Sequence, residues 1–429
     1  MTPQIKNRIE QMRRGEVPEG YKRTKVGIVP EEWHVFSVGE LYSERKESGD
    51  PKLPILSVSI HSGVSDGELD EEELGKKVKR IEDKTQYQIA RAGDITFNMM
   101  RAWQGAIGVV RTDGLVSPAY IVAKPNQFVF PPYMDLLVKM PDMINKLHGK
   151  SYGVTDFRLR LYWDSFVKVD LCLPPLPEQE KIAEILAAQD RVIALLERKI
   201  ELLQKLKKVF LQKMFPAKGQ TVPAWRFKGF SGDWEQRQFV DLYDYASEGG
   251  TPSTNINDYY EGGTIPFVKI EDTVEKYITS PKSFITEEGM NHSSAWLIPA
   301  GNVIFTNGAT VGNVAINKLP VTTKQGILGI IPSSKVSSEF LYYLLSGASF
   351  QKEVRSRIAI GTFATIILKS LNEIPVSLPL DAKEQDAISD VLSGIDNLIT
   401  LHQRKCDAEK QKKKALMQLL LTGIVRVKV

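Results

Sequence analysis

Residues 173–186 read LPPLPEQEKIAEIL, and residues 378–392 read LPLDAKEQDAISDVL. Both stretches begin as a proline-marked loop and continue into an acidic helix start with apolar residues three or four positions apart. Pro177 suits the first position of a helix, because the N–H that proline lacks would have no partner there. Asp381 and Glu384 have the spacing of a capping box. The chain therefore starts the same kind of helix twice.

The similarity between the two halves extends well beyond these helix starts. Aligning Glu178 with Glu384 gives an offset of 206 residues. With small insertions, the alignment also matches Trp33 with Trp234, AGDITF (92–97) with AGNVIF (300–305), and YMDLLVK (133–139) with LYYLLSG (341–347). An internal repeat indicates a duplicated structural unit. We interpret the chain as two half-copies, each a globular module followed by a long helix.

Each predicted helix has residues at alternating steps of three and four that form a coiled-coil seam. In the first helix the seam comprises Ile182, Leu186, Gln189, Ile193, Leu196, Ile200, Leu203, Leu206, Phe210 and Met214. In the second it comprises Ile388, Leu392, Ile395, Ile399, His402, Cys406, Glu409, Lys412, Leu416 and Leu420. Each helix spans about 37 residues, or roughly 55 Å. The two stripes can cover each other in an antiparallel, intramolecular coiled coil.

The predicted fold class is mixed α/β, with two pseudo-repeated globular modules joined by the two antiparallel helices. Short β-type runs punctuated by Gly and Asn favour mixed modules. The segment IEQMRRGEVP (9–18) resembles the helix end LQKMFPAKGQTVP (211–223), which indicates a pseudo-twofold, circular arrangement. We expect the first module with an N-terminal helix at 1–172, the central helix at 173–216, the second module at 217–377, and the C-terminal helix and tail at 378–429.

The composition is that of an ordinary globular protein that can bind nucleic acid but need not. The net charge is +4, with 42% hydrophobic and 25% charged residues. Basic residues gather at 198–213 and at 404–428, although such runs are often solvated helix faces. There is neither an export leader nor an apolar run of about 18 residues, and two cysteines make no disulfide framework. We therefore expect a cytoplasmic protein.

The sequence contains no recognisable catalytic constellation. The five histidines form no group with Cys, Asp or Glu at metal-ligand spacing, and neither GxxxxGK[ST] nor GxGxxG follows a predicted strand. We expect a binding or organising protein that carries no metal and no cofactor of its own.

Two variable modules in tandem, each followed by a helix entered through a segment that runs from Leu-Pro to Glu-Gln (LPPLPEQ at 173–179 and LPLDAKEQ at 378–385), resemble the specificity subunit of type I restriction–modification systems. The resemblance covers nearly the whole chain and rests on residues 173–215 and 378–423, the two matched tryptophans, and AGDITF with AGNVIF. It implies two target recognition domains that read an asymmetric, bipartite site on double-stranded DNA. It also implies two modification (methyltransferase) subunits and, through them, two restriction (endonuclease and translocase) subunits. The partners would bind S-adenosylmethionine, ATP and Mg.

Candidate DNA contacts lie in the polar loops of the modules. Arginine pairs with guanine, and asparagine or glutamine with adenine, through two parallel hydrogen bonds. The candidates are Asn98, Arg101, Gln104, Arg158, Arg160, Lys269, Asn307, Thr310, Lys324, Gln325, Arg355 and Arg357. The exposed helix faces would hold the modification subunits, with Lys207 and Lys208 as candidates, together with Tyr42 and Tyr243 near the module starts.

Two other functions remain open at this stage. The first is a stand-alone DNA-processing enzyme, which methyl transfer or DNA cleavage by the purified chain alone would support. The second is a coiled-coil adaptor whose modules bind protein, which competition by DNA carrying the target site would separate from DNA recognition.

Overall fold

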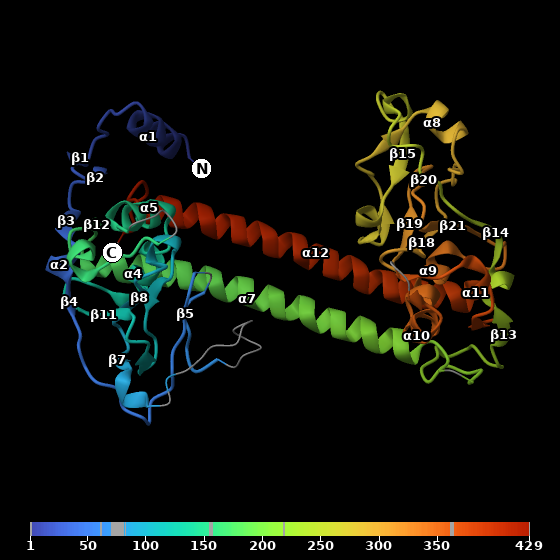
Figure 1. Cartoon of the computed structure of the whole chain (residues 1–429), viewed down its shortest axis with the longest axis horizontal. Helices are drawn as coiled ribbons and strands as arrows, with labels where there is room; N and C mark the ends of the chain where they lie inside the picture. Colours follow the sequence, from blue (N-terminus) through green and yellow to red (C-terminus); the bar gives the residue numbers. More distant parts are fainter. Residues whose placement is uncertain are drawn as a thin grey trace. The chain divides into compact units, whose positions relative to one another are not determined.

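The computed structural model describes residues 2–60, 62–69, 81, 83–153, 158–217, 219–360 and 364–428. The chain divides into two compact units. Unit 1 holds Met1–Leu195 and Lys405–Val429, and unit 2 holds Leu196–Arg404. Two long helices, α7 (Leu176–Lys213) and α12 (Ala382–Leu421), each begin in one unit and end in the other (Figure 1). Each unit therefore contains one half of both helices.

An antiparallel four-stranded sheet forms the centre of unit 1, in the order β4 (Tyr42–Glu44), β11 (Tyr120–Pro125), β8 (Ile95–Asn98), β9 (Ile107–Val109). The paired strands around it are β1 (Tyr21–Thr24) with β2 (Gly27–Pro30), β3 (His34–Ser37) with β12 (Asp170–Leu173), β5 (Val58–Ser59) with β6 (Gly63–Val64), and β7 (Gln88–Ala90) with β10 (Gly114–Val116). The shorter helices are α1 (Pro3–Arg13), α2 (Val38–Leu41), α4 (Pro131–Leu137), α5 (Pro141–Lys150), α6 (Trp163–Phe166) and the 3-10 turns η1 (Lys84–Gln86) and η2 (Ala102–Gln104). The core packs Trp33, Phe97 and Tyr133 against Ile182 and Leu186 of α7.

Unit 2 has a five-stranded sheet in the order β14 (Tyr243–Glu248), β21 (Ile327–Pro332), β18 (Val303–Thr306), β19 (Val314–Asn317), β16 (Tyr277–Ile278). Its other strands are β13 (Glu235–Gln238) with β24 (Pro375–Leu378), β15 (Ile265–Val268) between β17 (Phe284–Ile285) and β20 (Thr322–Thr323), and β22 (Ala359–Ile360) with β23 (Ala364–Thr365). Its shorter helices are α8 (Glu287–Asn291), α9 (Ser338–Ser346), α10 (Ala348–Ser356), α11 (Leu368–Asn372) and the 3-10 turns η3 (Phe239–Leu242), η4 (Asn257–Tyr259) and η5 (Ile270–Thr273). Trp234, Phe305 and Phe340 pack against Ile388 and Leu392 of α12.

The two units share one plan, as the sequence repeat predicts. The strand order β4-β11-β8-β9 of unit 1 reappears as β14-β21-β18-β19 in unit 2, to which β16 adds a parallel edge strand. In each unit a short antiparallel pair, β3 with β12 or β13 with β24, leads into a long helix. The predicted mixed α/β fold with two repeated modules and two long helices is confirmed.

The two long helices run antiparallel within each unit. In unit 1, Gln189 Nε2 of α7 donates to the Glu409 carboxylate of α12 at 2.6 Å. Beside it, Lys413 Nζ lies 2.6 Å from Asp190 Oδ1. In unit 2, Lys207 Nζ lies 2.6 Å from Asp396 Oδ1. The last two ion pairs occupy equivalent positions of the repeat, because both partners match at the offset of 206.

The predicted seam is correct in its first part and wrong at one position of each helix. Ile182, Leu186, Ile193, Leu196 and Ile200 are buried, but Leu206 is 42% exposed. In α12, Lys412 is likewise exposed. The reason is the same in both helices: the following lysine, Lys207 or Lys413, faces the partner helix and pairs there with an aspartate.

Both ends of the chain belong to unit 1, in agreement with the circular arrangement. The tail that follows α12 enters the core of the unit, since Leu420 and Leu421 are buried there. Helix α1 lies outside that core and has no buried residue. It contacts the tail through Arg8 Nη1, which donates to the Ile424 carbonyl at 2.7 Å.

Candidate nucleic-acid interface

The Glu-Gln pair at the start of α12 joins that helix to its module. In unit 2, the buried Glu384 carboxylate accepts two hydrogen bonds from Arg226, at 2.7 Å from Nε and 2.8 Å from Nη2. It also accepts one from the Trp234 indole at 3.3 Å. The bonds to Glu384 raise the pKa of Arg226 above its ordinary value. This Trp–Glu–Arg cluster fixes the first turn of α12 against the module.

Unit 1 builds the same cluster with an arginine from the other end of the chain. The Glu178 carboxylate accepts from the Trp33 indole at 3.1 Å and from Arg426 at 2.7 and 2.8 Å. The bonds to Glu178 raise the pKa of Arg426. Arg426 belongs to VRVK (425–428), which resembles WRFK (225–228) around Arg226. The C-terminal tail thus supplies the arginine of the cluster in unit 1, and the segment after α7 supplies the arginine of the cluster in unit 2.

The glutamine that follows each glutamate holds a loop of the module. Gln179 Nε2 donates to the carbonyls of Phe128 (2.9 Å) and Pro174 (3.0 Å), and its Oε1 accepts from Phe130 N at 2.9 Å. Gln385 Nε2 donates to the Lys335 carbonyl at 3.0 Å. The Glu-Gln pair at the start of each long helix therefore positions a module on that helix, which explains why the pair occurs twice.

Each module has one loop that is held by the same backbone bonds in both copies. Leu161 N donates to the Met99 carbonyl in unit 1, and Ile366 N donates to the Asn307 carbonyl in unit 2, both at 2.9 Å. The loops connect β8 with β9 and β18 with β19. We name residues 98–106 bridged loop 1 and residues 306–313 bridged loop 2.

The shared scaffold presents different side chains in the two units. Next to the bridge, unit 1 carries the larger or charged residues Met100, Arg101, Arg160 and Tyr162, where unit 2 carries Gly308, Ala309, Thr365 and Ile367. Gly308 lies close to a neighbouring backbone segment, because a Cβ there would lie 3.0 Å from the Gly326 Cα. The two loops therefore offer unlike surfaces on one frame.

The unit 1 candidates from the sequence gather at bridged loop 1. Asn98 ends β8, and its Oδ1 accepts from Met100 N at 3.0 Å. Arg101 precedes the η2 turn and Gln104 is its last residue, and both are exposed. Arg158 and Arg160 are exposed in the segment that the Leu161 bridge brings beside the loop. The candidate group thus combines three exposed arginines with two amide side chains.

Backbone bonds also bring the unit 2 candidates to bridged loop 2. The Gly326 carbonyl accepts from Asn307 N and Gly308 N, so Lys324 and Gln325 lie beside the loop. Lys324 N donates to the Val268 carbonyl at 3.0 Å, which brings Lys269 to the same edge. Gln351 Nε2 of α10 donates to the Gly312 carbonyl at 2.9 Å, and Arg355 and Arg357 lie at the end of that helix.

The unit 2 candidates differ in the solvent exposure of their side chains. The exposed members are Thr310, Lys324, Gln325 and Arg355, and Lys269 is half-buried. Arg357 pairs with Glu353 four residues earlier. The Asn307 side chain is buried, and its Nδ2 donates to the Ile366 carbonyl at 3.3 Å.

The candidate partner contacts lie in four different surroundings. The Tyr42 ring is buried, and burial raises the pKa of its hydroxyl. Tyr243 is half-buried, and its hydroxyl donates to Asn372 Oδ1 at 2.7 Å. Lys207 faces α12 in its ion pair with Asp396, whereas Lys208 is exposed.

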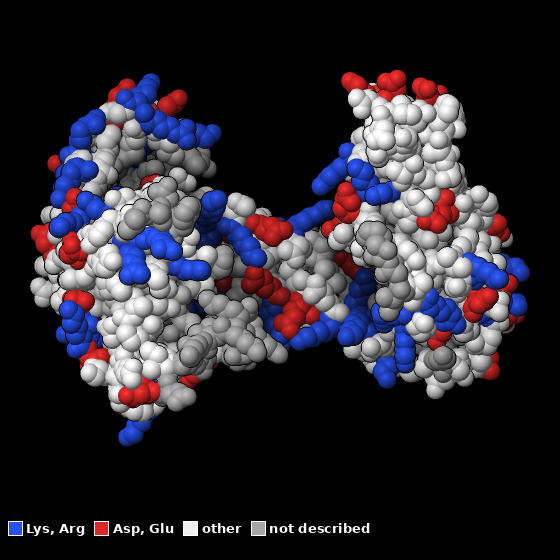
Figure 2. Space-filling view, viewed as in Figure 1, with Lys and Arg blue, Asp and Glu red and all other residues white. Residues whose placement is uncertain are grey.

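Figure 2 shows Lys and Arg side chains over α1 and the neighbouring hairpin of unit 1, and acidic side chains at the tip of unit 2 that carries α8.

Within the described part of the chain, no group of three His, Cys, Asp or Glu side chains could hold a metal ion. No described helix is long and apolar enough to cross a membrane.

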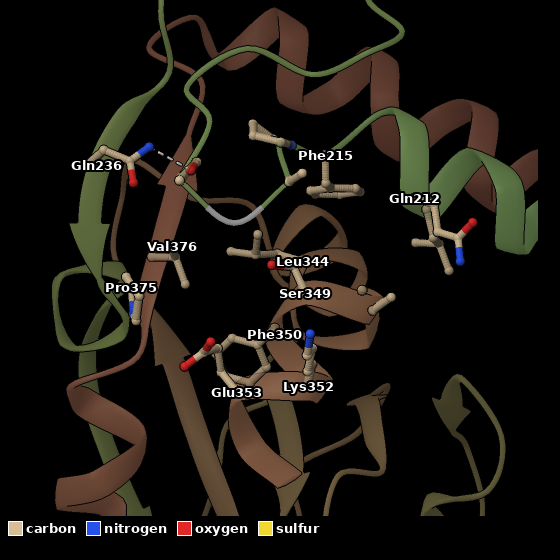
Figure 3. Close-up of a pocket in the computed structure, with 17 residues that line it drawn as sticks. Gln212, Phe215, Gln236, Leu344, Ser349, Phe350, Lys352, Glu353, Pro375 and Val376 are labelled. Atoms are coloured by element: carbon tan, nitrogen blue, oxygen red, sulfur yellow. Dashed lines mark hydrogen bonds between the residues drawn. The ribbon is translucent and has the colours of Figure 1, made fainter. Parts of the chain in front are cut away.

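A cavity of about 320 Å³ in unit 2 lies between the end of α7, α10 and β24, and the residues that line it do not include bridged loop 2 (Figure 3). Its lining includes the apolar side chains of Phe215, Leu344, Phe350 and Val376, together with Lys352. A smaller cavity of about 210 Å³ occupies the equivalent place in unit 1, between the end of α12, α5 and β12. The pair is a further product of the duplication.

The fold and the bridged loops define a tandem recognition protein, in which one scaffold carries two different loop surfaces. The family model for the type I restriction modification DNA specificity domain matches residues 30–205 and 231–409. The chain belongs to this family, which its two matched copies and their spacing confirm.

Curated relatives agree with that assignment. The MjaVIII specificity subunit of a type I restriction enzyme from Methanocaldococcus jannaschii is 27% identical, over 96% of this chain and 97% of its own length. The EcoR124I/EcoR124II specificity subunit from Escherichia coli is 26% identical, over 54% of this chain and 56% of its own length.

Solved structures share the fold. A chain from a study of complex assembly and conformational transition of the type I R-M system superposes with a TM-score of 0.59 at 20% identity, covering 92% of this chain and 99% of that one. The S subunit of a type I restriction–modification system from M. genitalium gives 0.52 at 14% identity, covering 92% and 97%.

Proposed function

We propose that this chain is the DNA sequence-specificity subunit of a type I restriction–modification complex and is itself non-catalytic. One observation carries the proposal: a single scaffold, built twice, presents a different set of side chains at each bridged loop. Base identity is read by side chains, while the scaffold sets their register on the duplex. The target is then an asymmetric, bipartite site on double-stranded DNA, with one half-site for each module.

The twelve candidate DNA contacts are part of this proposal. Their exposure favours Arg101, Gln104, Arg158 and Arg160 for the first half-site, and Thr310, Lys324, Gln325 and Arg355 for the second. We assign target recognition domains to residues 1–172 (with the N-terminal helix) and 217–377, and the connecting helices to 173–216 and 378–429. We further propose that the length of these helices sets the unread spacer between the half-sites.

The test is a map of methylated bases across the host genome, with the gene intact and deleted. Loss of one gapped, asymmetric motif on deletion would support the proposal and reveal both half-sites. An unchanged map in a host whose modification subunit is active would refute it. Exchange of residues 17–172 for a relative's module should then alter one half-site and leave the other unchanged.

Arg101 should be a main determinant of the first half-site. Its guanidinium is exposed on bridged loop 1, and a bidentate arginine–guanine pair is worth about 1–3 kcal/mol of discrimination. Arg101→Ala should therefore reduce discrimination at one base pair of that half-site about tenfold or more. Methylation of a library of altered sites measures the effect. The control Arg237→Ala removes an exposed arginine of β13 that pairs with Glu235, and it should alter neither half-site. Unchanged specificity of Arg101→Ala would remove Arg101 from the reading set.

The partners are proposed to be two modification subunits, which bind S-adenosylmethionine and transfer the methyl group. Two restriction subunits, which use ATP and Mg, would join through them in the cytoplasm.

Exposed apolar residues on the long helices support a docking face for the modification subunits, because such patches mark interaction sites. Val192 and Leu195 of α7 match Leu398 and Leu401 of α12 at the offset of 206, and all four are exposed. Two equivalent faces suit two copies of one partner.

Leu195→Glu and Leu401→Glu should each remove one of the two docked modification subunits. Leu195 is 71% and Leu401 60% exposed, so the free chain should keep its stability. A carboxylate buried in an apolar interface is costly, and the affinity at that face should fall at least tenfold. Native mass spectrometry of the complex counts the bound copies. The double variant should bind none, and the exposed control Gln204→Glu should bind two. Two bound copies with the double variant would exclude these faces.

A further inference from the structure

Two tyrosine rings stand beside bridged loop 1, and none of the contacts proposed above uses them. Tyr152 and Arg160 exchange two backbone hydrogen bonds of 3.0 Å, in a bridge next to the segment that Leu161 ties to the loop. The Tyr152 and Tyr162 ring centroids are 5.0 Å apart, with planes inclined by 32°. Tyr152 is 51% exposed, and Met100 on the adjacent loop is 48% exposed. We call the two rings the tyrosine pair.

Exposed arginines lie on the same two segments as Met100 and Tyr162. Arg101 lies on the bridged loop, and Arg158 and Arg160 lie in the segment that carries Tyr162. Aromatic rings and guanidinium planes are the groups on which proteins stack unpaired or splayed bases, and the positive charge attracts the phosphate backbone. The rings together with three arginines, beside a DNA-reading loop, match the chemistry of a nucleobase.

The same place in unit 2 lacks this surface. Thr365 and Ile367 stand where unit 1 has Arg160 and Tyr162, and Gly308 stands where it has Met100. The duplication keeps the backbone bridge at both sites, so the rings are not required by the scaffold. We infer that the rings serve a contact that unit 1 makes and unit 2 does not.

We propose that the tyrosine pair stacks against a base of the first half-site that has left its place in the duplex. This inference rests on the proposed function and adds a base-stacking site to it. Enzymes that modify a base inside DNA extrude it and must offset the cost of unstacking. A ring surface in the recognition module would stabilise the opened duplex and favour half-sites that contain an easily unstacked step.

The experiment uses the full chain with its modification subunits and duplex DNA carrying the methylated motif. Tyr152→Ala should weaken binding of this DNA about tenfold, whereas Tyr152→Phe, which keeps the ring, should stay within about twofold. The dependence of affinity on salt should not change, because stacking releases no counterions.

The matched control is Phe128→Ala, which removes a 49% exposed ring of the same unit at the start of α7. It should bind as the wild type does. Wild-type affinity of Tyr152→Ala, or an equal loss with Tyr152→Phe, would overturn the stacking proposal. A wild-type complex that does not prefer its motif over other DNA would instead refute the proposed function, so the two failures are distinguishable.

Discussion

Arg226→Ala should lower the free energy of unfolding of unit 2 by about 3 kcal/mol. The variant leaves the Glu384 carboxylate, which is 1% exposed, with the Trp234 indole as its remaining donor in the cluster. A buried charge that has lost its partner is far more costly than a surface ion pair is stabilising. Arg426→Ala should have the same effect on unit 1, because Glu178 is buried to nearly the same degree.

Hydrogen exchange measured segment by segment in the full chain would report each unit separately. Arg226→Ala should lower protection in β13 and β24, and Arg426→Ala in β3 and β12. The double variant Arg226→Met with Glu384→Gln should recover part of the loss, since the buried charge is gone and the new amide oxygen can still accept from Trp234. Arg14→Ala, which removes a surface pair with Glu16, should cost well under 1 kcal/mol. A loss below about 1 kcal/mol for Arg226→Ala would mean that the cluster does not hold the helix start.

The repeated helix starts and most of the seam could be predicted because each depends on residues close together in the chain. The offset of 206 could be predicted because it compares one half of the sequence directly with the other. Periodicity of three and four residues already identifies a buried stripe. The sequence could not predict that Lys207, and not Leu206, occupies the seam, because this depends on Asp396 in the opposite helix. The residues around Lys207 in the sequence do not indicate that its side chain pairs with an aspartate of the other helix.

The alignment of the halves places five candidates on the two loops, namely Asn98, Arg101, Gln104, Asn307 and Thr310. It predicts neither their exposure nor that the other candidates lie beside these loops. Asn307 is a polar loop residue in the sequence, yet its amide is buried against Ile366, because the bridge closes over it. Sequence reasoning missed Arg426 altogether, although VRVK and WRFK carry the signal once the tail is aligned with the segment after α7. The similarity appears only when the C-terminal tail is compared with the segment after α7, and an alignment of the two halves in chain order does not include this comparison.

A buried polar network in unit 2 was equally out of reach of sequence reasoning. Lys276 has a side chain only 9% exposed, and its ammonium lies within 2.7–2.8 Å of Glu339, Tyr343 and Ser393. Burial lowers the pKa of Lys276 below its ordinary value. The Tyr343 hydroxyl in turn donates to Asp396 Oδ2 at 2.7 Å. These groups come from three separate stretches of the chain, and no local pattern brings them together.

Asp396→Ala should therefore cost unit 2 about 2–3 kcal/mol, whereas the matched Asp190→Ala should cost unit 1 less than about 1 kcal/mol. The Asp396 side chain is only 17% exposed, and it accepts from Tyr343 while pairing with Lys207, so its loss removes a largely buried acceptor from both donors. Asp190 pairs with Lys413 at a more exposed position and has Ala187 where unit 2 has Ser393. The two substitutions remove the same side chain from equivalent positions of one repeat, which isolates the effect of the network.

Protection from hydrogen exchange in α9 and β16 measures the first cost, and protection in α4 and β9 measures the second. Tyr343→Phe should reproduce part of the Asp396→Ala effect without removing a charge. In a double-mutant cycle, Lys207→Ala with Asp396→Ala should cost less than the sum of the single changes, because the two side chains contact each other. Equal costs for Asp190→Ala and Asp396→Ala would show that the interhelical ion pair, which both units have, sets the stability of this position. A larger cost for Asp396→Ala would show that the duplicated chain fastens its second module to the helices by polar contacts that its first module does not share.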